Sequence, residues 1–146
     1  MPATFHRSFT APGDAALLWE ATAPDRLAEL HPLIHAVTDV TGDDYDQTFI
    51  VHEHIPLGPL RLPNRYRSRR VRGNPLRLEA WAGAGVHLVH QLTVREEAGS
   101  VHVEHVVEVE APWPVAGFVE RTAQVAHDRW IAAVQAWMAA EHDRRG

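Results

Sequence analysis

The sequence contains no cysteine and no lysine among its 146 residues, and each absence removes a class of chemistry. Without a thiol, the chain cannot form a disulfide, bind an iron–sulfur cluster through cysteine or use a thiolate nucleophile. Without a lysine amine, it cannot form a lysine Schiff base with a carbonyl substrate or with pyridoxal phosphate. Imidazole, carboxylate, guanidinium and hydroxyl groups are left for any binding or catalytic role.

Long apolar runs and a positive net charge are also missing. No apolar run approaches the ~20 residues that span a bilayer, and the N-terminus lacks a signal pattern, so we expect a soluble, cytoplasmic protein. The formal net charge is −5, which argues against nucleic-acid binding because that affinity comes largely from phosphate neutralisation. The length of 146 residues is that of one ordinary domain, and we expect residues 1–146 to form a single domain.

The first third of the chain predicts a short strand followed by two short helices. Residues 4–9 alternate between apolar and polar positions, which is typical of a strand. Asp14 is expected to cap the first helix, and Thr22 to cap a second helix that begins at Pro24 and ends before Pro32. The two helices together form a helix-kink-helix that packs its leucines inward.

The rest of the chain predicts an antiparallel meander and one long helix. Clusters of Gly, Asp, Asn and Pro divide the region into six strands, at residues 34–41, 45–55, 64–72, 76–82, 86–96 and 101–111. Apolar residues then recur at spacings of three or four over 115–141, which indicates a helix long enough to cross the whole sheet. The charged tail 141–146 is expected to fray. The fold class is therefore α+β, with a curved antiparallel seven-stranded sheet against a long C-terminal helix.

Hairpin registers follow from the requirement that paired strands keep their apolar residues on one face. The turns at residues 73–75, 83–85 and 97–100 then predict the cross-strand pairs Ser68–Ala80, Arg70–Leu78, Ala80–Leu88, Leu78–His90, Leu92–His105 and His90–Val107. The three registers agree on the buried face. They place His90 and His105 on that face, on adjacent strands, as diagonal neighbours about 7–8 Å apart.

Two segments resemble a known superfamily. Phe9 to Trp19 reads FTAPGDAALLW, and Leu30-His31-Pro32 follows the second helix. Both are similar to the START-like, or SRPBCC, superfamily, in which a strand runs through Ala-Pro into a helix and an aromatic-His-Pro motif enters the second strand. The resemblance implies the helix-grip fold with a cavity between sheet and C-terminal helix, and a small hydrophobic molecule as partner.

The expected cavity contains several polar groups among apolar ones. The residues that we predict to line it and to bind a ligand are Tyr66, Ser68, Arg70, Leu78, Leu88, His90, His105, His127 and Trp130. An alternative for each imidazole is a core residue that is hydrogen-bonded to backbone or water. A buried Arg70 would need a carboxylate or an anionic ligand group as partner, unless its side chain extends to water at the strand end.

The segment His52-Glu53-His54 places either its glutamate or both its histidines in the cavity, because side chains alternate along a strand. Counting apolar neighbours favours Glu53 inward. There desolvation would raise its pKa and make it a candidate general acid or base, together with His90 and His105. Glu53 is also a candidate partner for Arg70, and a solvated Glu53 is the alternative.

Eleven histidines call for a test of metal binding, since imidazole is a common metal ligand. The pairs His87/His90 and His102/His105 are three residues apart, which puts their members on opposite faces of a strand. A site of His90, His105 and a carboxylate is geometrically conceivable, but the sequence holds no recognised metal motif. We therefore expect no metal and no cofactor.

The apolar segment 55–63 contains three prolines, which cannot donate to a sheet ladder, and is expected to project as a loop. Its leucines would form a cavity entrance or a homodimer contact, or pack on the long helix. For the whole chain we expect a binding or carrier protein for a small hydrophobic molecule. The alternatives are a cofactor-independent enzyme that resembles polyketide aromatase/cyclases, with proton transfer by histidine or Glu53, and an interaction domain like the chaperone-activating members.

Overall fold

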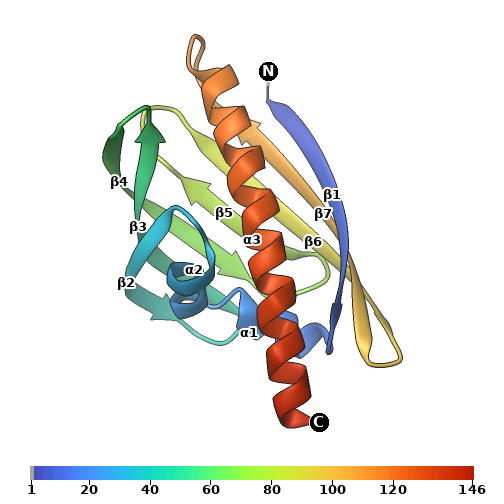
Figure 1. Cartoon of the computed structure of the whole chain (residues 1–146). Helices are drawn as coiled ribbons and strands as arrows, with labels where there is room; N and C mark the ends of the chain where they lie inside the picture. Colours follow the sequence, from blue (N-terminus) through green and yellow to red (C-terminus); the bar gives the residue numbers. More distant parts are fainter. Residues whose placement is uncertain (1) are drawn as a thin grey trace.

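Seven antiparallel strands curve around one long helix in the computed structural model, which describes residues 2–146 (Figure 1). The elements are β1 (Ala3–Pro12), α1 (Ala15–Ala21), α2 (Pro24–Leu30), β2 (Ile34–Gly42), β3 (Asp46–Leu57), β4 (Leu60–Val71), β5 (Leu76–Trp81), β6 (His87–Glu97), β7 (Ser100–Glu110) and α3 (Ala116–Arg145). This order confirms the predicted helix-grip fold.

The sheet is a meander that is closed at one side by the first strand. Its order is β1-β7-β6-β5-β4-β3-β2, so every neighbour except the β1–β7 pair is consecutive in the chain. Helix α3 lies across one face of the sheet, and α1 and α2 sit beside its C-terminal half (Figure 1). The α3 backbone lies near those of β1, β7, α1 and α2.

The predicted hairpin registers are confirmed. Leu78 lies opposite His90, and His90 lies opposite Val107. Ser68 lies opposite Ala80 on the β4–β5 side. Because side chains alternate along each strand, these pairs fix the residues of β4 to β7 that face α3.

The β3–β4 connection differs from the projecting loop that its prolines predict. Both strands continue to a tight turn at Gly58, whose φ of 60° lies in the left-handed region that glycine adopts without strain. At this end β2 pairs with β3 only as far as Glu53, and β5 pairs with β4 only from Arg67 onward. The hairpin tip is therefore two-stranded. A proline is tolerated there when its nitrogen, which carries no hydrogen, faces the side without a partner strand.

The helix ends match the predictions in part. The Asp14 carboxylate caps α1 by accepting a hydrogen bond from the Leu17 amide at 2.8 Å, as predicted. Thr22 does not cap α2, because the N-cap of that helix is Ala23. The Thr22 hydroxyl instead donates to the Trp19 carbonyl oxygen at 3.0 Å. The expected fraying after residue 141 is also wrong, because α3 continues to Arg145, which forms an ion pair with Glu20 at 2.8 Å.

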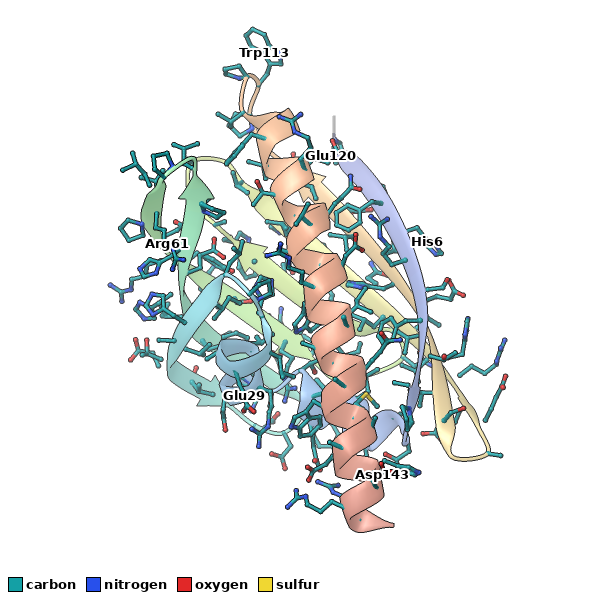
Figure 2. The ribbon with its side chains drawn as sticks, in the orientation of Figure 1. His6, Glu29, Arg61, Trp113, Glu120 and Asp143 are labelled. Atoms are coloured by element: carbon teal, nitrogen blue, oxygen red, sulfur yellow. The ribbon has the colours of Figure 1, made fainter. Side chains whose placement is uncertain are left out.

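The main core lies between the sheet, α1 and the C-terminal half of α3. From α3 it includes Trp130, Val134 and Met138, all buried. Charged side chains lie on the outside, and among those labelled in Figure 2 are Glu29, Arg61 and Asp143. Within residues 2–146, no helix is both long and apolar enough to cross a membrane.

Candidate functional site

A cavity of about 530 Å³ lies between the N-terminal half of α3 and the sheet. Most of its wall is apolar, with side chains such as Val51 on β3, Leu88 on β6 and Val119 on α3. Residues at the β3–β4 hairpin, the β5–β6 loop and the start of α3 also line it, among them Leu62, Ala84 and Phe118. Figure 1 shows that these three segments meet at one end of the molecule, so we identify that end as the entrance.

Seven of the nine residues predicted to bind a ligand line this cavity: Tyr66, Ser68, Leu78, Leu88, His90, His127 and Trp130. His105 has no exposed surface, and its ring packs directly behind that of His90, with ring centroids 5.4 Å apart. Arg70 is also absent from the cavity wall. Five of these seven, Tyr66, Ser68, Leu78, Leu88 and His90, lie on the face of β4 to β6 that the hairpin registers select.

Arg70 is buried, at 3% exposure, and within residues 2–146 its hydrogen-bond acceptors are not carboxylates, the protein partner that the sequence suggested. Its guanidinium carbon lies 3.4 Å from the centre of the Trp19 ring. Its N–H groups donate to the Trp19 carbonyl oxygen, to the Thr22 hydroxyl at 2.9 Å and to the Gln47 side-chain oxygen at 3.1 Å. Burial lowers the pKa of Arg70 to about 10, so it remains a cation that joins α1 to the sheet.

Glu53 faces the cavity from β3, which agrees with the inward orientation that its apolar neighbours in the sequence favour. Its carboxyl group accepts hydrogen bonds from the Asn64 amide at 3.1 Å and from the Tyr66 hydroxyl at 3.2 Å, both on β4. Desolvation raises the pKa of Glu53, and the two hydrogen bonds oppose that shift. Burial and the neighbouring Glu53 also raise the pKa of Tyr66, which therefore stays protonated and donates.

The histidines that flank Glu53 lie on the outer face of the sheet. His52 hydrogen-bonds to the Thr38 hydroxyl at 2.9 Å, and His54 stacks on His35 with ring centroids 4.3 Å apart. This outcome resolves the alternative that the sequence left open. It removes His52 and His54 from the list of cavity candidates.

Three histidines from different elements converge at the cavity wall: His90 on β6, His105 on β7 and His127 on α3. Nδ1 of His90 lies 3.2 Å from Nε2 of His105 and 2.9 Å from Nε2 of His127. Nδ1 of His127 donates to the carbonyl oxygen of Ala123 at 2.7 Å, because a carbonyl oxygen only accepts. Within the described part of the chain, Nδ1 of His105 has no hydrogen-bond partner.

The buried histidines are neutral at neutral pH. Burial, reinforced by repulsion from His127, lowers the pKa of His105 to about 3. Burial lowers the pKa of His127 to about 4, although its hydrogen bond to Ala123 favours the charged form. The pKa of His90 is lowered well below its usual value by burial and by its two imidazole neighbours. Neutral imidazoles keep a lone pair on one nitrogen, so the cluster can accept protons or bind a cation.

Four polar residues that line the cavity were predicted neither as ligand contacts nor as proton-transfer groups: His31, Asn64, Glu79 and Thr122. His31, which belongs to the Leu30-His31-Pro32 motif, lines the cavity; its Nδ1 accepts the Leu33 amide at 3.2 Å, and burial lowers its pKa to about 3. Asn64 lines the cavity beside Glu53. The signal for Asn64 was available, because continuing the β3–β4 pairing toward the turn puts it opposite Glu53.

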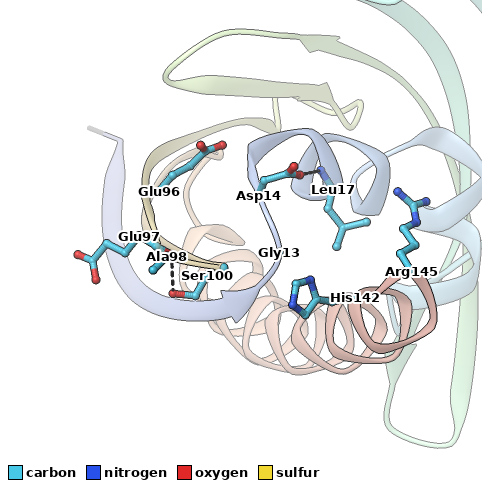
Figure 3. A pocket seen from close by; sticks show the side chains of 11 residues that line it. Gly13, Asp14, Leu17, Glu96, Glu97, Ala98, Ser100, His142 and Arg145 are labelled. Carbon is cyan, nitrogen blue, oxygen red and sulfur yellow. Dashed lines mark hydrogen bonds between the residues drawn. The ribbon is translucent and has the colours of Figure 1, made fainter.

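A second hollow of about 450 Å³ lies where α1, the β6–β7 turn and the end of α3 meet (Figure 3). Its acidic groups already have partners: Asp14 caps the Leu17 amide, Glu96 accepts the Ala15 amide at 2.8 Å, and Glu97 pairs with Arg95 at 2.9 Å. Its cation Arg145 is paired with Glu20. These side chains stabilise the start of α1 and the end of α3, and we place the functional site in the sheet–helix cavity.

Comparison with solved structures confirms the helix-grip fold. The Zhui aromatase/cyclase from Streptomyces sp. R1128 superimposes with a TM-score of 0.69 at 17% identity, covering 99% of this chain and 96% of that chain. Ara h 8.0201 superimposes with a TM-score of 0.70 at 14% identity, covering 94% of this chain and 98% of that chain. Norcoclaurine synthase from Thalictrum flavum superimposes with a TM-score of 0.65 at 14% identity, covering 94% of this chain and 86% of that chain.

These neighbours are START-like, or SRPBCC, proteins, which agrees with the resemblance inferred from the sequence. No protein-family model matches the chain, and no curated protein is similar to it in sequence. The shared feature is the fold itself. Because ligand carriers and enzymes use the same fold, function has to be inferred from the cavity.

Proposed function

We propose that this protein binds a small hydrophobic molecule in the cavity between α3 and the sheet. The supporting observation is the cavity itself: its volume of about 530 Å³ falls within the range of about 300–1,000 Å³ that small-molecule sites occupy. Its wall combines apolar side chains with a few convergent polar groups, which is the usual composition of such sites. The same observation argues against an interaction domain whose interior is filled by side chains.

The polar groups favour a neutral ligand that carries a hydroxyl or carbonyl group. No arginine lines the cavity within residues 2–146, and Arg70 is engaged by Trp19 and Thr22. An anionic group would therefore lack a cation and would face Glu53. A ligand hydroxyl can donate to Glu53 or to an imidazole lone pair, and a ligand carbonyl can accept from a protonated Glu53.

The test uses the neutral fluorescent probe N-phenyl-1-naphthylamine. We expect its fluorescence to rise on binding to the wild-type protein and to fall when 2-naphthol displaces it. Naphthalene, which lacks the hydroxyl, is expected to compete less well than 2-naphthol. That difference should shrink when Glu53→Gln removes the carboxylate acceptor.

Two variants of α3 provide the matched comparison. Ala123→Phe puts a large side chain into the cavity, where Ala123 is buried, and should weaken probe binding at least ~10-fold by occupying the space. Ala132→Phe makes the same change on the exposed side of the same helix and should leave binding unchanged. Absence of probe binding to the wild type, or equal binding by both variants, would disprove a ligand cavity.

A cofactor-independent cyclase-like enzyme is the second candidate, and the position of Glu53 favours it. A buried carboxyl group with a raised pKa faces the space in which a substrate would lie, and a carboxyl group in that position can both accept and return a proton. Aldol closure and dehydration of a reactive chain need only such proton transfers. The neighbouring fold of the Zhui aromatase/cyclase supports this candidate without assigning a substrate.

A further inference from the structure

We propose that His90, His105 and His127 form a binding site for a divalent transition metal of the Zn²⁺ type at the wall of the cavity. The ligands would be Nδ1 of His90 and Nε2 of both His105 and His127. This site goes beyond the binding of an apolar ligand and does not depend on it. The spacing of histidines along a single strand does not reveal this site. Its three residues come from three different elements, β6, β7 and α3.

The distances between the three nitrogens resemble those of a metal site. One contact is 3.2 Å and another is 2.9 Å, and all three atoms lie within 4.8 Å of one another. A tetrahedral zinc ion with Zn–N bonds of about 2.0–2.1 Å keeps its ligand nitrogens about 3.4 Å apart. Small shifts of the rings would therefore bring the cluster to coordination geometry.

Hydrogen bonding alone does not satisfy the two N···N contacts. His127 donates its Nδ1 proton to Ala123, so its Nε2 carries a lone pair toward His90. If His90 carries a proton on Nδ1, that one hydrogen has to serve both neighbours; if His105 donates to His90 instead, the contact with His127 has no hydrogen. Neutral imidazoles thus supply one usable hydrogen for two contacts, whereas a cation would satisfy all three nitrogens.

The surroundings of the cluster fit metal coordination. Metal-bound histidines commonly donate their other ring nitrogen to a backbone carbonyl, as His127 does to Ala123. Three imidazoles suit Zn²⁺, Co²⁺, Ni²⁺ and Cu²⁺ better than Mg²⁺ or Ca²⁺, which prefer oxygen ligands.

The metal would have access to the cavity. His90 and His127 both line the cavity, whereas His105 lies behind them with no exposed surface. With three protein ligands, a tetrahedral ion keeps one position for water or for an oxygen atom of a bound molecule. The chemical class of ligand at that position is therefore a neutral or anionic oxygen donor.

The experiment titrates chelator-treated full-length protein with Zn²⁺ by calorimetry and with Co²⁺ by visible absorption. We expect one metal ion per chain and the intense absorption of four-coordinate Co²⁺. His127→Gln and His90→Gln should each weaken Zn²⁺ binding by at least ~100-fold, since loss of an outer-shell partner alone costs ~10–100-fold. The double variant His35→Gln/His54→Gln removes the stacked pair on the outer face and should bind like the wild type.

Two further measurements keep the outcome unambiguous. Circular dichroism establishes that each variant folds, and nitrogen-15 spectra of wild-type histidine rings identify the coordinating atoms without any substitution. Zn²⁺ should shift Nδ1 of His90 and Nε2 of His105 and His127. No stoichiometric binding, ring shifts confined to outer-face histidines, or unweakened binding by folded His127→Gln and His90→Gln would each overturn the site. Probe binding to the chelated wild type is measured separately, so failure of the metal site is distinguishable from failure of the ligand cavity.

Discussion

At the scale of single residues, the protonation of Glu53 links stability to function. Burial raises its pKa above the ordinary value of 4.5, against the effect of hydrogen bonds from Asn64 and Tyr66. The folded protein therefore holds the proton more tightly than the unfolded chain does. Stability from this group is fully present below the unfolded pKa and is lost as pH rises through the folded pKa.

Replacing Glu53 by glutamine is therefore expected to stabilise the protein at pH 7, because glutamine is neutral and does not pay the desolvation cost that raises the pKa of Glu53. The advantage over the wild type should shrink as the pH is lowered toward 4.5, where the wild-type carboxyl group is protonated. Urea unfolding at a series of pH values measures both effects. Glu108→Gln, on an exposed site of β7, is the control, and its difference from the wild type should not vary with pH in this way.

A Glu53→Gln variant that is less stable than the wild type at pH 7 would contradict this account. It would mean that the hydrogen bonds from Asn64 and Tyr66 outweigh the cost of burial. For the cyclase-like candidate, the same variant should lose turnover while it retains binding of the neutral probe. Retained turnover would exclude Glu53 as the proton-transfer group.

How far single residues can be predicted from the sequence depends on what orients them. Glu53 and His90 face inward because alternation and hairpin register are local rules, and both were predicted correctly. The contact of His127 with His90 depends on how α3 rotates over the sheet, which no local rule states. Arg70 was predicted to be inward and is buried, but its partner Trp19 comes from α1, 51 residues earlier in the chain.

At the scale of elements, α1 shows how acidic side chains fix a helix start. Asp14 accepts the Leu17 amide, and Glu96 from β6 accepts the Ala15 amide. Both satisfy amide groups that a helix N-terminus leaves without an internal partner. One carboxylate is local in the sequence, and the other joins the helix to the β6–β7 hairpin.

Asp14→Ala should therefore lower the free energy of unfolding by about 1 kcal/mol, within a range of about 0.5–2 kcal/mol for lost N-caps. Asp14→Asn keeps an oxygen acceptor at the same place and should remain close to the wild type. Chemical denaturation of the three proteins measures the difference. Equal losses in both variants would show that the charge of Asp14 matters more than its cap hydrogen bond.

Most element boundaries were predictable because turn residues mark them, and the exceptions have tertiary causes. The β3–β4 hairpin runs to Gly58 despite its prolines, because the neighbouring strands stop short and leave an unpaired side. Helix α3 continues to Arg145 because that residue pairs with Glu20 of α1. The local sequence reveals neither where the neighbouring strands stop nor that Arg145 pairs with Glu20.

At the scale of the whole molecule, α3 divides the interior into two parts. Its C-terminal half contributes Val134 and Met138 to a closely packed core, whereas its N-terminal half borders the cavity. Local opening requires less free energy where fewer buried contacts are lost. The cavity end is therefore expected to open more readily than the core end.

Hydrogen exchange measured by mass spectrometry should reveal this division. Without ligand, amides at the tip of the β3–β4 hairpin should exchange faster than those of β7, which is paired on both sides. N-phenyl-1-naphthylamine should slow exchange at the hairpin and in the N-terminal half of α3, with little effect on β7. In Ala123→Phe the probe should have no such effect, and protection confined to β1 and β7 in the wild type would contradict the position of the cavity.

The polar groups of the cavity are placed on separate elements, and this arrangement has a stereochemical consequence. Glu53 projects from β3, His90 from β6 and His31 from the end of α2, so the three contact points do not lie along one strand. Three fixed contacts distinguish a molecule from its mirror image, because only one of the two can reach all three at once. The cavity should therefore prefer one enantiomer of a chiral ligand, and a ring closed inside it should form with one handedness.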